Sequence, residues 1–172
     1  MNRKILIIVL LSVALAAAIT SVCLIVFKKE TVLLPDYAPP ALEENAEKIE
    51  GESGDKMEVS EGGGGVNLIY KDQVVIDLSE EKITSMHFVN PGKSYNNMVI
   101  QVVVKGEVVA QSGTLAPGYR LNTLNLLKGA AGKLRAGAYA EDTKFVIAFY
   151  DPDTSEKAIL QNEIPITVVV QE

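Results

Sequence analysis

The stretch that decides the fold is MVIQVVVKGEVVAQS, which runs from Met98 to Ser112. Its first half is apolar at almost every position, so both faces of the period-two pattern are apolar. This predicts a β-strand that is covered on both sides. Gly106 then turns the chain back into a second apolar stretch that ends at Ser112. The sequence therefore predicts two strands joined by a tight turn.

The same period-two signal continues on both sides of this hairpin. It is clearest where Phe145, Ile147 and Phe149 alternate with other apolar residues. Pro165 cannot donate to a strand ladder, so it is expected at a sheet edge or at a switch between sheets. Short strands separated by turn residues predict an all-β domain, a β-sandwich of about seven to nine strands. They are expected over residues 66–70, 74–78, 83–89, 98–105, 107–112, 119–124, 145–150, 157–161 and 166–170.

One local motif makes the fold prediction more specific. The pattern Leu134-x-x-Gly137-x-Tyr139 precedes the core strand that starts near Phe145. It resembles the tyrosine corner of immunoglobulin-like domains, which implies that the tyrosine hydroxyl closes a loop onto the backbone. The chain has no tryptophan, and its one cysteine is Cys23. The resemblance is therefore to the cysteine-free immunoglobulin-like modules of bacteria.

Several turn and core motifs of the domain also resemble small membrane-anchored surface and envelope proteins of Gram-positive bacteria. This resemblance implies a fold and a location, and it implies no activity. The motifs are Asn90-Pro91-Gly92-Lys93-Ser94, Gln111-Ser112-Gly113, Pro117-Gly118, Gly137-x-Tyr139 and Phe149-Tyr150-Asp151-Pro152.

A long apolar run begins at Ile5 and ends at Phe27 without a single charged residue. As a helix it would be about 35 Å long, enough to cross a hydrocarbon core of about 30 Å. We predict a single-pass transmembrane anchor over residues 1–29, with the C-terminal domain on the extracytoplasmic side of the cell membrane. Two alternatives are signal-peptide cleavage after Ala16-Ala17-Ala18, which would leave an apolar new terminus, and lipid attachment at Cys23.

Charge is distributed unevenly along the chain, whose net charge is −6. Residues 30–65 hold ten acidic residues against two lysines, together with three prolines and a run of four glycines. This composition predicts an acidic, flexible linker. Residues 66–172 hold ten basic and twelve acidic residues, so the predicted domain is nearly neutral. It lacks the basic surface that nucleic-acid binding requires.

Few residues carry a pattern typical of chemistry. His87 is the only histidine, and its neighbours predict a position on a sheet face rather than a catalytic role. Asp151, Asp153 and Glu156 lie in one loop and are weak candidates for a calcium site, because calcium prefers oxygen ligands. An ordinary hairpin turn explains the same residues, and no other cofactor is indicated.

The cluster Tyr95-Asn96-Asn97 has the composition of an adaptable binding loop and is a candidate partner-binding site. An ordinary polar loop is the alternative. No small-molecule substrate is evident. The sequence therefore favours a non-enzymatic binding or scaffold module that contacts another envelope protein, such as an accessory of a secretion, conjugation or pilus assembly. The alternative is a module that binds a cell-wall polymer or glycan.

Overall fold

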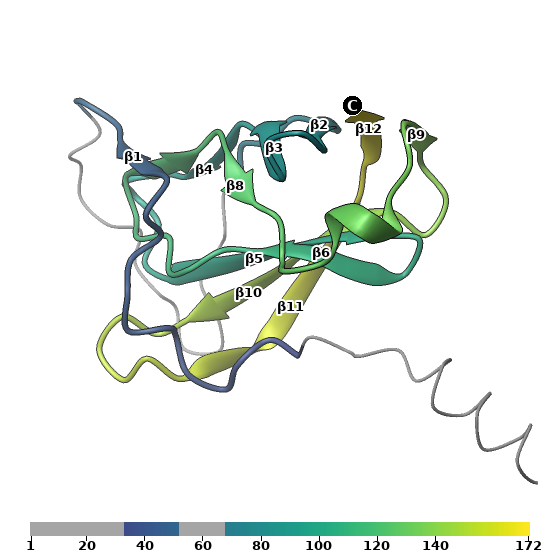
Figure 1. Ribbon diagram of the computed structural model, residues 1–172. Coiled ribbons are helices and arrows are strands. Elements are labelled where there is room, and N and C mark those ends of the chain that lie inside the picture. Colours follow the sequence, from purple (N-terminus) through teal and green to yellow (C-terminus); the bar gives the residue numbers. More distant parts are fainter. Residues whose placement is uncertain (1–32, 52–67) are drawn as a thin grey trace, which may run out of the picture. The chain divides into compact units, whose positions relative to one another are not determined.

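The backbone is built almost entirely from β-strands (Figure 1). The computed structural model describes residues 33–51 and 68–172, which belong to one unit of the chain, Val32–Glu172. The predicted all-β class is confirmed for this part of the chain. Its elements are β1 (Ala46–Lys48), β2 (Gln73–Asp77), β3 (Lys82–Ser85), β4 (Phe88–Asn90), β5 (Asn97–Val104), β6 (Glu107–Gln111), β7 (Tyr119–Leu121), β8 (Leu124–Asn125), the 3-10 helix η1 (Ala131–Lys133), β9 (Gly137–Tyr139), β10 (Lys144–Tyr150), β11 (Lys157–Pro165) and β12 (Thr167–Gln171).

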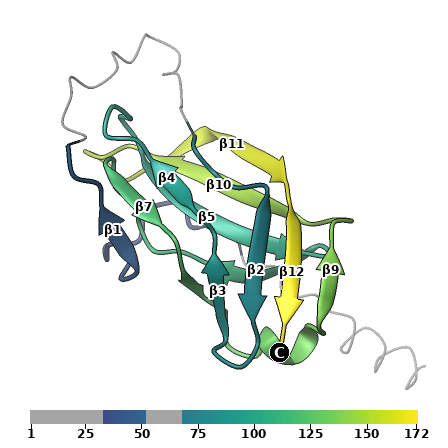
Figure 2. The ribbon, with the colours of Figure 1, turned by 90° about the horizontal axis from the view of Figure 1, so that it is seen from above.

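The described strands form three sheets. A four-stranded sheet has the order β11-β10-β5-β6, a five-stranded sheet the order β8-β3-β2-β12-β9, and a three-stranded sheet the order β1-β7-β4. The hairpin that the sequence predicts forms β5 and β6, and β5 is paired on its other side with β10. Figures 1 and 2 show the four-stranded and five-stranded sheets as two facing layers.

The main core lies between these two layers. Ile100 of β5 belongs to one buried cluster with Ile76 and Val168 of the five-stranded sheet. Val99 of β5 and Ala148 of β10 lie on the opposite face and belong to a second buried cluster. Both faces of β5 are therefore buried, which explains why its sequence is apolar at nearly every position.

Residues 33–51 lie against the domain, although their composition predicts a flexible linker. β1 pairs antiparallel with β7, and Leu34 packs into the second buried cluster on the outer face of the four-stranded sheet. Figure 1 shows this docked segment passing along that sheet and then on to β1. The linker prediction is wrong for residues 33–51, and the unit begins at Val32 instead of residue 66.

Hydrogen bonds explain how an acidic, proline-rich segment becomes ordered. The buried Glu43 accepts a hydrogen bond at Oε2 from the backbone N–H of Gly113, at 2.6 Å. Its Oε1 accepts two more from Asn45, from the backbone N–H at 3.1 Å and from Nδ2 at 3.0 Å. The Thr114 hydroxyl donates to the carbonyl of Pro39 at 2.7 Å. Two of these bonds, from Gly113 and from Thr114, thus join the segment to residues 70 and 75 positions away in the sequence.

The C-terminal strands confirm the sheet switch expected at Pro165. β11 ends at this proline in the four-stranded sheet, and after the buried Ile166 the chain continues as β12 in the five-stranded sheet. There β12 pairs in parallel with β2 and antiparallel with β9. Because β12 is paired on both sides, it cannot accept a partner strand, so the C-terminal strand is not a binding edge.

Two predicted strands are divided between sheets. The stretch 83–89 forms β3 and β4, which belong to different sheets, and 119–124 forms β7 and β8 in the same way. The first division falls at His87, whose φ is 46°. His87 is exposed, whereas Met86 and Phe88 on either side are fully buried. The prediction that His87 lies on a sheet face is wrong, because the chain leaves one sheet for the other at this residue.

The described residues contain twelve strands, more than the predicted seven to nine. The two divided strands add two to the predicted nine, and β1 and β9, which the sequence did not predict, add another two. The strand predicted over residues 66–70 is not among the twelve, because in its described part, 68–70, only Ile69 forms a bridge, to Val89. β9 ends at Tyr139, whose hydroxyl donates to the carbonyl of Arg135 at 2.8 Å and accepts from its N–H at 3.2 Å. The predicted closure of this loop by the tyrosine hydroxyl is therefore confirmed.

Candidate functional site

The two loops that carry the candidate site residues come together at one end of the four-stranded sheet. β5 starts at Asn97 and β10 ends at Tyr150, and these two residues are register partners. The loop before β5 and the turn after β10 are therefore neighbours. The Tyr95 hydroxyl links them by donating a hydrogen bond to Asp153 Oδ2, at 3.1 Å. We call residues 94–97 and 151–156 the loop cluster.

Asp151 of this cluster stabilises the turn that follows β10. Asp151 Oδ1 accepts hydrogen bonds from the backbone N–H groups of Asp153, at 2.8 Å, and Thr154, at 2.9 Å. These bonds, that of Thr154 above all, lower the pKa of the Asp151 carboxyl. Across residues 33–51 and 68–172, no three His, Cys, Asp or Glu side chains are grouped so that they could hold a metal. The structure thus does not bring Asp151, Asp153 and Glu156 together as a calcium site.

The loop that carries Tyr95, Asn96 and Asn97 is fixed from beneath by a buried amide. Asn90 has no exposed surface, and its Nδ2 donates to the carbonyls of Asn96, at 3.0 Å, and of Leu115, at 2.9 Å. The backbone of the loop is therefore held to β4 and to the chain after β6. In the sequence Asn90 is recognisable only as a turn residue before a proline. That pattern does not reveal that its side chain holds the carbonyls of Asn96 and Leu115.

Tyr95 keeps its proton in this arrangement. Its hydrogen bond to Asp153, together with partial desolvation and the nearby carboxylates of Asp151 and Asp153, raises the pKa of Tyr95. Tyr95, Asn96 and Asn97 are all half-buried. Residues 95–97 of the loop cluster therefore present neutral hydroxyl and amide groups on a backbone that is already positioned. Such a surface suits recognition by hydrogen bonding and aromatic contact.

Two hydroxyl groups in the chain that follows β6, those of Ser112 and Thr114, have structural partners. Ser112 Oγ accepts from the backbone N–H of Ile100 at 2.9 Å and donates to the carbonyl of Gly113 at 2.8 Å. The Thr114 hydroxyl is bound to Pro39. Both hydroxyls therefore hold the backbone of the chain that follows β6.

A second surface adjoins the loop cluster and was not predicted. Backbone hydrogen bonds at 2.7 and 2.8 Å join residues 36–38 antiparallel to residues 155–157, at the start of β11. Four large apolar side chains near this pairing, two at the start of the docked segment and two in β11, are exposed, and Ile159 is fully exposed. We call them the apolar edge: Leu33 (78% exposed), Tyr37 (60%), Ile159 (108%) and Leu160 (61%).

An irregularity in β11 exposes two of these side chains. Ala148 of β10 pairs with Gln161, but Tyr150 pairs with Lys157, so three residues of β11 stand opposite one of β10. Such a bulge re-aims side chains away from the regular pleat. Ile159 and Leu160 lie within it. A hydrophobicity pattern does not reveal a bulge, so the strand predicted over residues 157–161 gave no sign that these side chains are exposed.

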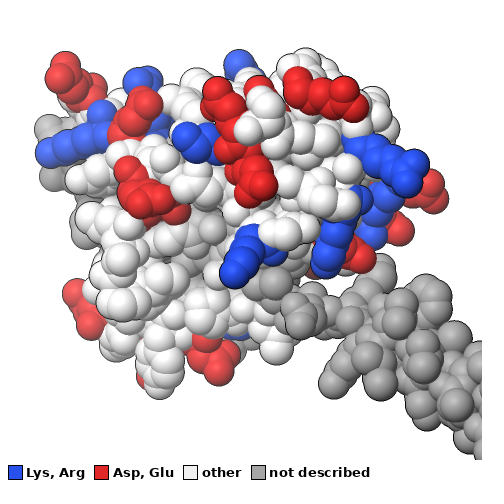
Figure 3. All heavy atoms as spheres, viewed as in Figure 1, with Lys and Arg blue, Asp and Glu red and all other residues white. Residues whose placement is uncertain are grey.

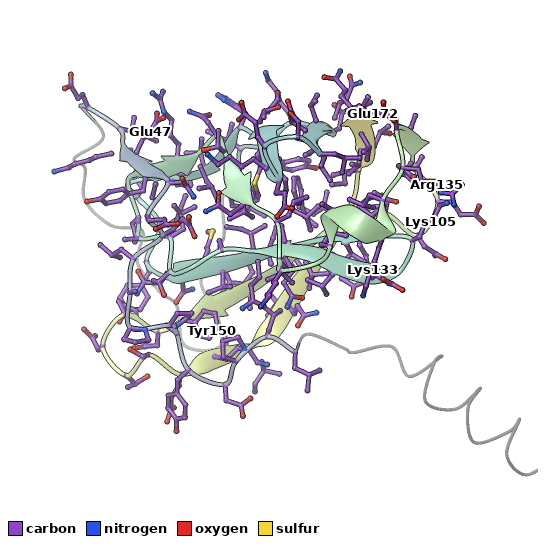
Figure 4. All side chains as sticks on the ribbon, in the orientation of Figure 1. Glu47, Lys105, Lys133, Arg135, Tyr150 and Glu172 are labelled. Atoms are coloured by element: carbon purple, nitrogen blue, oxygen red, sulfur yellow. The ribbon has the colours of Figure 1, made fainter. Side chains whose placement is uncertain are left out.

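Charged side chains gather elsewhere on the molecule. In Figure 3 they lie mainly over the upper part, whereas the lower part, where β10 and β11 lie in the same view, is largely uncharged. At the end near β9, the ammonium of Lys105 lies 4.6 Å from the ring centre of Tyr139, and Lys133 pairs with Glu107 at 3.5 Å. Figure 4 shows Arg135 at the same end.

Comparison of this chain with protein families, with curated proteins and with solved structures finds no match. Within the two described ranges, no helix combines the length and the apolar character needed to cross a bilayer. The predicted anchor between Ile5 and Phe27 lies outside these ranges, so it stays a prediction.

Proposed function

We propose that this protein is a membrane-anchored, non-enzymatic binding module whose domain contacts another protein of the cell envelope. In this proposal the apolar run from Ile5 to Phe27 is the anchor and the domain is extracytoplasmic. The domain is an immunoglobulin-like β-sandwich, an assignment supported by its two facing sheets and by the loop that Tyr139 closes.

The observation that carries the proposal is the preformed loop cluster. Two loops more than fifty residues apart in sequence are joined by the Tyr95–Asp153 hydrogen bond, and Asn90 fixes the first of them from below. A positioned loop loses little conformational entropy when it binds, which favours affinity. Tyrosine and asparagine provide contact area and adaptable hydrogen bonds at low entropic cost. The partner surface is therefore Tyr95, Asn96 and Asn97 together with the adjoining turn.

Site-specific crosslinking in intact cells tests this proposal. A photo-crosslinking residue replaces Asn96 in the full-length protein, because the hydrogen bond from Asn90 goes to the backbone carbonyl of residue 96, which the substitution keeps. The matched control carries the same residue at the exposed Glu80, in the turn between β2 and β3. We expect one specific protein adduct from position 96, none from position 80, and loss of the adduct in Tyr95→Ala.

Equal labelling from both positions, or no protein adduct at all, would contradict a protein partner at the loop cluster. In the second case, binding of the protein to purified cell-wall polymer becomes the measurement that decides. Retention on the polymer that is lost in Tyr95→Ala would support the wall-binding alternative.

A further inference from the structure

The point at which the chain enters the domain is fixed on one face. Leu34 is only 9% exposed and packs with Val99 and Ala148 on the outer face of the four-stranded sheet. The fully buried Tyr150 donates its hydroxyl to the carbonyl of Pro35, at 2.8 Å. Residues 34 and 35 are therefore held to this sheet, and the chain that precedes them must approach the domain from here.

Very little chain separates this point from the predicted anchor. The apolar run ends at Phe27, and Leu33 is already the first described residue of the docked segment. Six residues in fully extended conformation span about 20 Å. The polar interfacial zone of a bilayer is itself about 5–8 Å thick on each side. If residues 5–27 cross the bilayer as proposed, a tether of this length keeps the point where the chain enters the domain within about 20 Å of the membrane.

The apolar edge is located where this tether meets the domain. Leu33 begins the docked segment, and the antiparallel pairing of residues 36–38 with 155–157 places Ile159 and Leu160 on the neighbouring strand. Between these two segments Lys157 forms an ion pair with Asp36, at 3.8 Å, and Glu156 is the one other charged residue of the paired stretches 36–38 and 155–157.

We propose that the apolar edge rests on the lipid surface of the membrane that holds the anchor, with Leu33, Tyr37, Ile159 and Leu160 in the interfacial zone. This inference rests on the proposed anchor. Apolar side chains exposed at a bulged edge strand gain from leaving water, and tyrosine prefers the boundary between headgroups and acyl chains. The docked segment thereby orients the domain on the membrane as well as tethering it.

Reconstitution of the full-length protein in vesicles of phosphatidylcholine and phosphatidylglycerol tests the proposal without any other protein. In a Cys23→Ser background, an environment-sensitive fluorophore is attached to Ile159→Cys or, as the matched control, to Glu80→Cys. We expect the probe at position 159 to emit at shorter wavelength. Its quenching by spin-labelled lipid should be at least threefold stronger than at position 80, and its quenching by aqueous iodide correspondingly weaker.

Two readouts separate failure of this inference from failure of the anchor. Flotation of the vesicles in alkaline carbonate reports the anchor alone, and loss of the protein from the vesicles there would overturn the proposed membrane attachment. If the protein floats with the vesicles while both probes are quenched equally, the lipid contact is wrong and the anchor stands. Shielding of position 159 in native membranes but not in pure lipid would also overturn it, because a protein would then cover the edge.

Discussion

Replacing Glu43 by alanine should detach part of the docked segment while the two main sheets stay folded. The carboxylate is 9% exposed and accepts three hydrogen bonds, the shortest from the backbone N–H of Gly113 at 2.6 Å. Alanine leaves that N–H without its partner at the contact between the segment and the chain after β6. The core cluster between the two layers contains no atom of Glu43, so it should persist.

The size of the effect follows from the three hydrogen bonds. A hydrogen bond to a charged group contributes about 1.5–3 kcal/mol, and the bond from Gly113 is the one that water replaces least well. Asn45 is half-buried, so its two donors recover part of their loss by hydration. Burial of the alanine methyl group in place of the carboxylate also removes the desolvation cost of a buried charge, which offsets another part of the loss. We expect the free energy of unfolding to fall by about 2–3 kcal/mol.

Urea denaturation of the unit that begins at Val32 measures this change, followed by tyrosine fluorescence because the chain has no tryptophan. Glu44→Ala is the matched control, since the exposed Glu44 makes only one hydrogen bond, to Asn125 at 3.0 Å. It should lose less than about 0.5 kcal/mol. Amide exchange should accelerate in β1 of Glu43→Ala and stay unchanged in β10. Equal stability of the two variants would refute the assignment of Glu43 as the residue that holds the docked segment.

Three further variants probe contacts of the docked segment and of the loop cluster. Gly113→Ala places a Cβ about 3.2 Å from the backbone of Glu43, so the free energy of unfolding should fall by about 1–3 kcal/mol. The same substitution made in the Glu43→Ala variant should lower it by less, and strict additivity of the two effects would contradict a shared contact. Asn90→Ala leaves the carbonyls of Asn96 and Leu115 without their shared donor and should cost about 2–4 kcal/mol in urea denaturation, a loss below about 1 kcal/mol being the contrary result. Burial, and then the charge of Asp36, raise the pKa of Tyr150 from 10.0 to about 12. Because the folded state favours the neutral phenol, its stabilisation is complete below pH 10 and is lost as the pH rises toward 12. Tyr150→Phe should show a flatter loss of stability over this range, and identical curves would contradict the assignment.

The sequence predicts those parts of the fold that depend on local alternation. The predictions of β5 and β10 are correct because the apolar residues repeat over a whole strand. The prediction of a sheet switch at Pro165 is correct because proline cannot donate a hydrogen bond to a strand ladder. The hydroxyl of Tyr139 could be assigned because its partner, Arg135, is four residues away. In each case the signal and its cause lie within one short stretch of chain.

The parts that could not be predicted depend on distant partners. Residues 33–51 are acidic and proline-rich, and composition alone indicates solubility. What orders them is the bond from Gly113 to Glu43 and the bond from Thr114 to Pro39, over 70 and 75 residues of sequence. The candidate site also depends on a distant contact. The sequence indicates Tyr95 and Asp153 as two separate candidates and gives no sign that they meet. The hydrogen bond that makes them one surface spans 58 residues.

The docked segment changes what the predicted anchor allows the domain to do. A flexible chain of 36 residues would have a typical end-to-end distance of about 30–36 Å. Because residues 33–51 are bound, only the chain between Phe27 and Leu33 sets the reach, at most about 20 Å. Residues 52–67 join two segments of the same unit, so their length adds nothing to it.

A tether this short determines where a partner can be met. The loop cluster lies at the end of the four-stranded sheet whose outer face holds the docked segment, so both surfaces share the side of the domain that the tether reaches. With the anchor proposed above, a partner that binds Tyr95 and Asn96 comes close to the membrane itself. This favours an integral membrane protein, or a subunit assembled on one, over a component of the outer cell wall. Crosslinking from position 96 should accordingly recover proteins of the membrane fraction, and recovery of soluble wall proteins alone would refute the short tether.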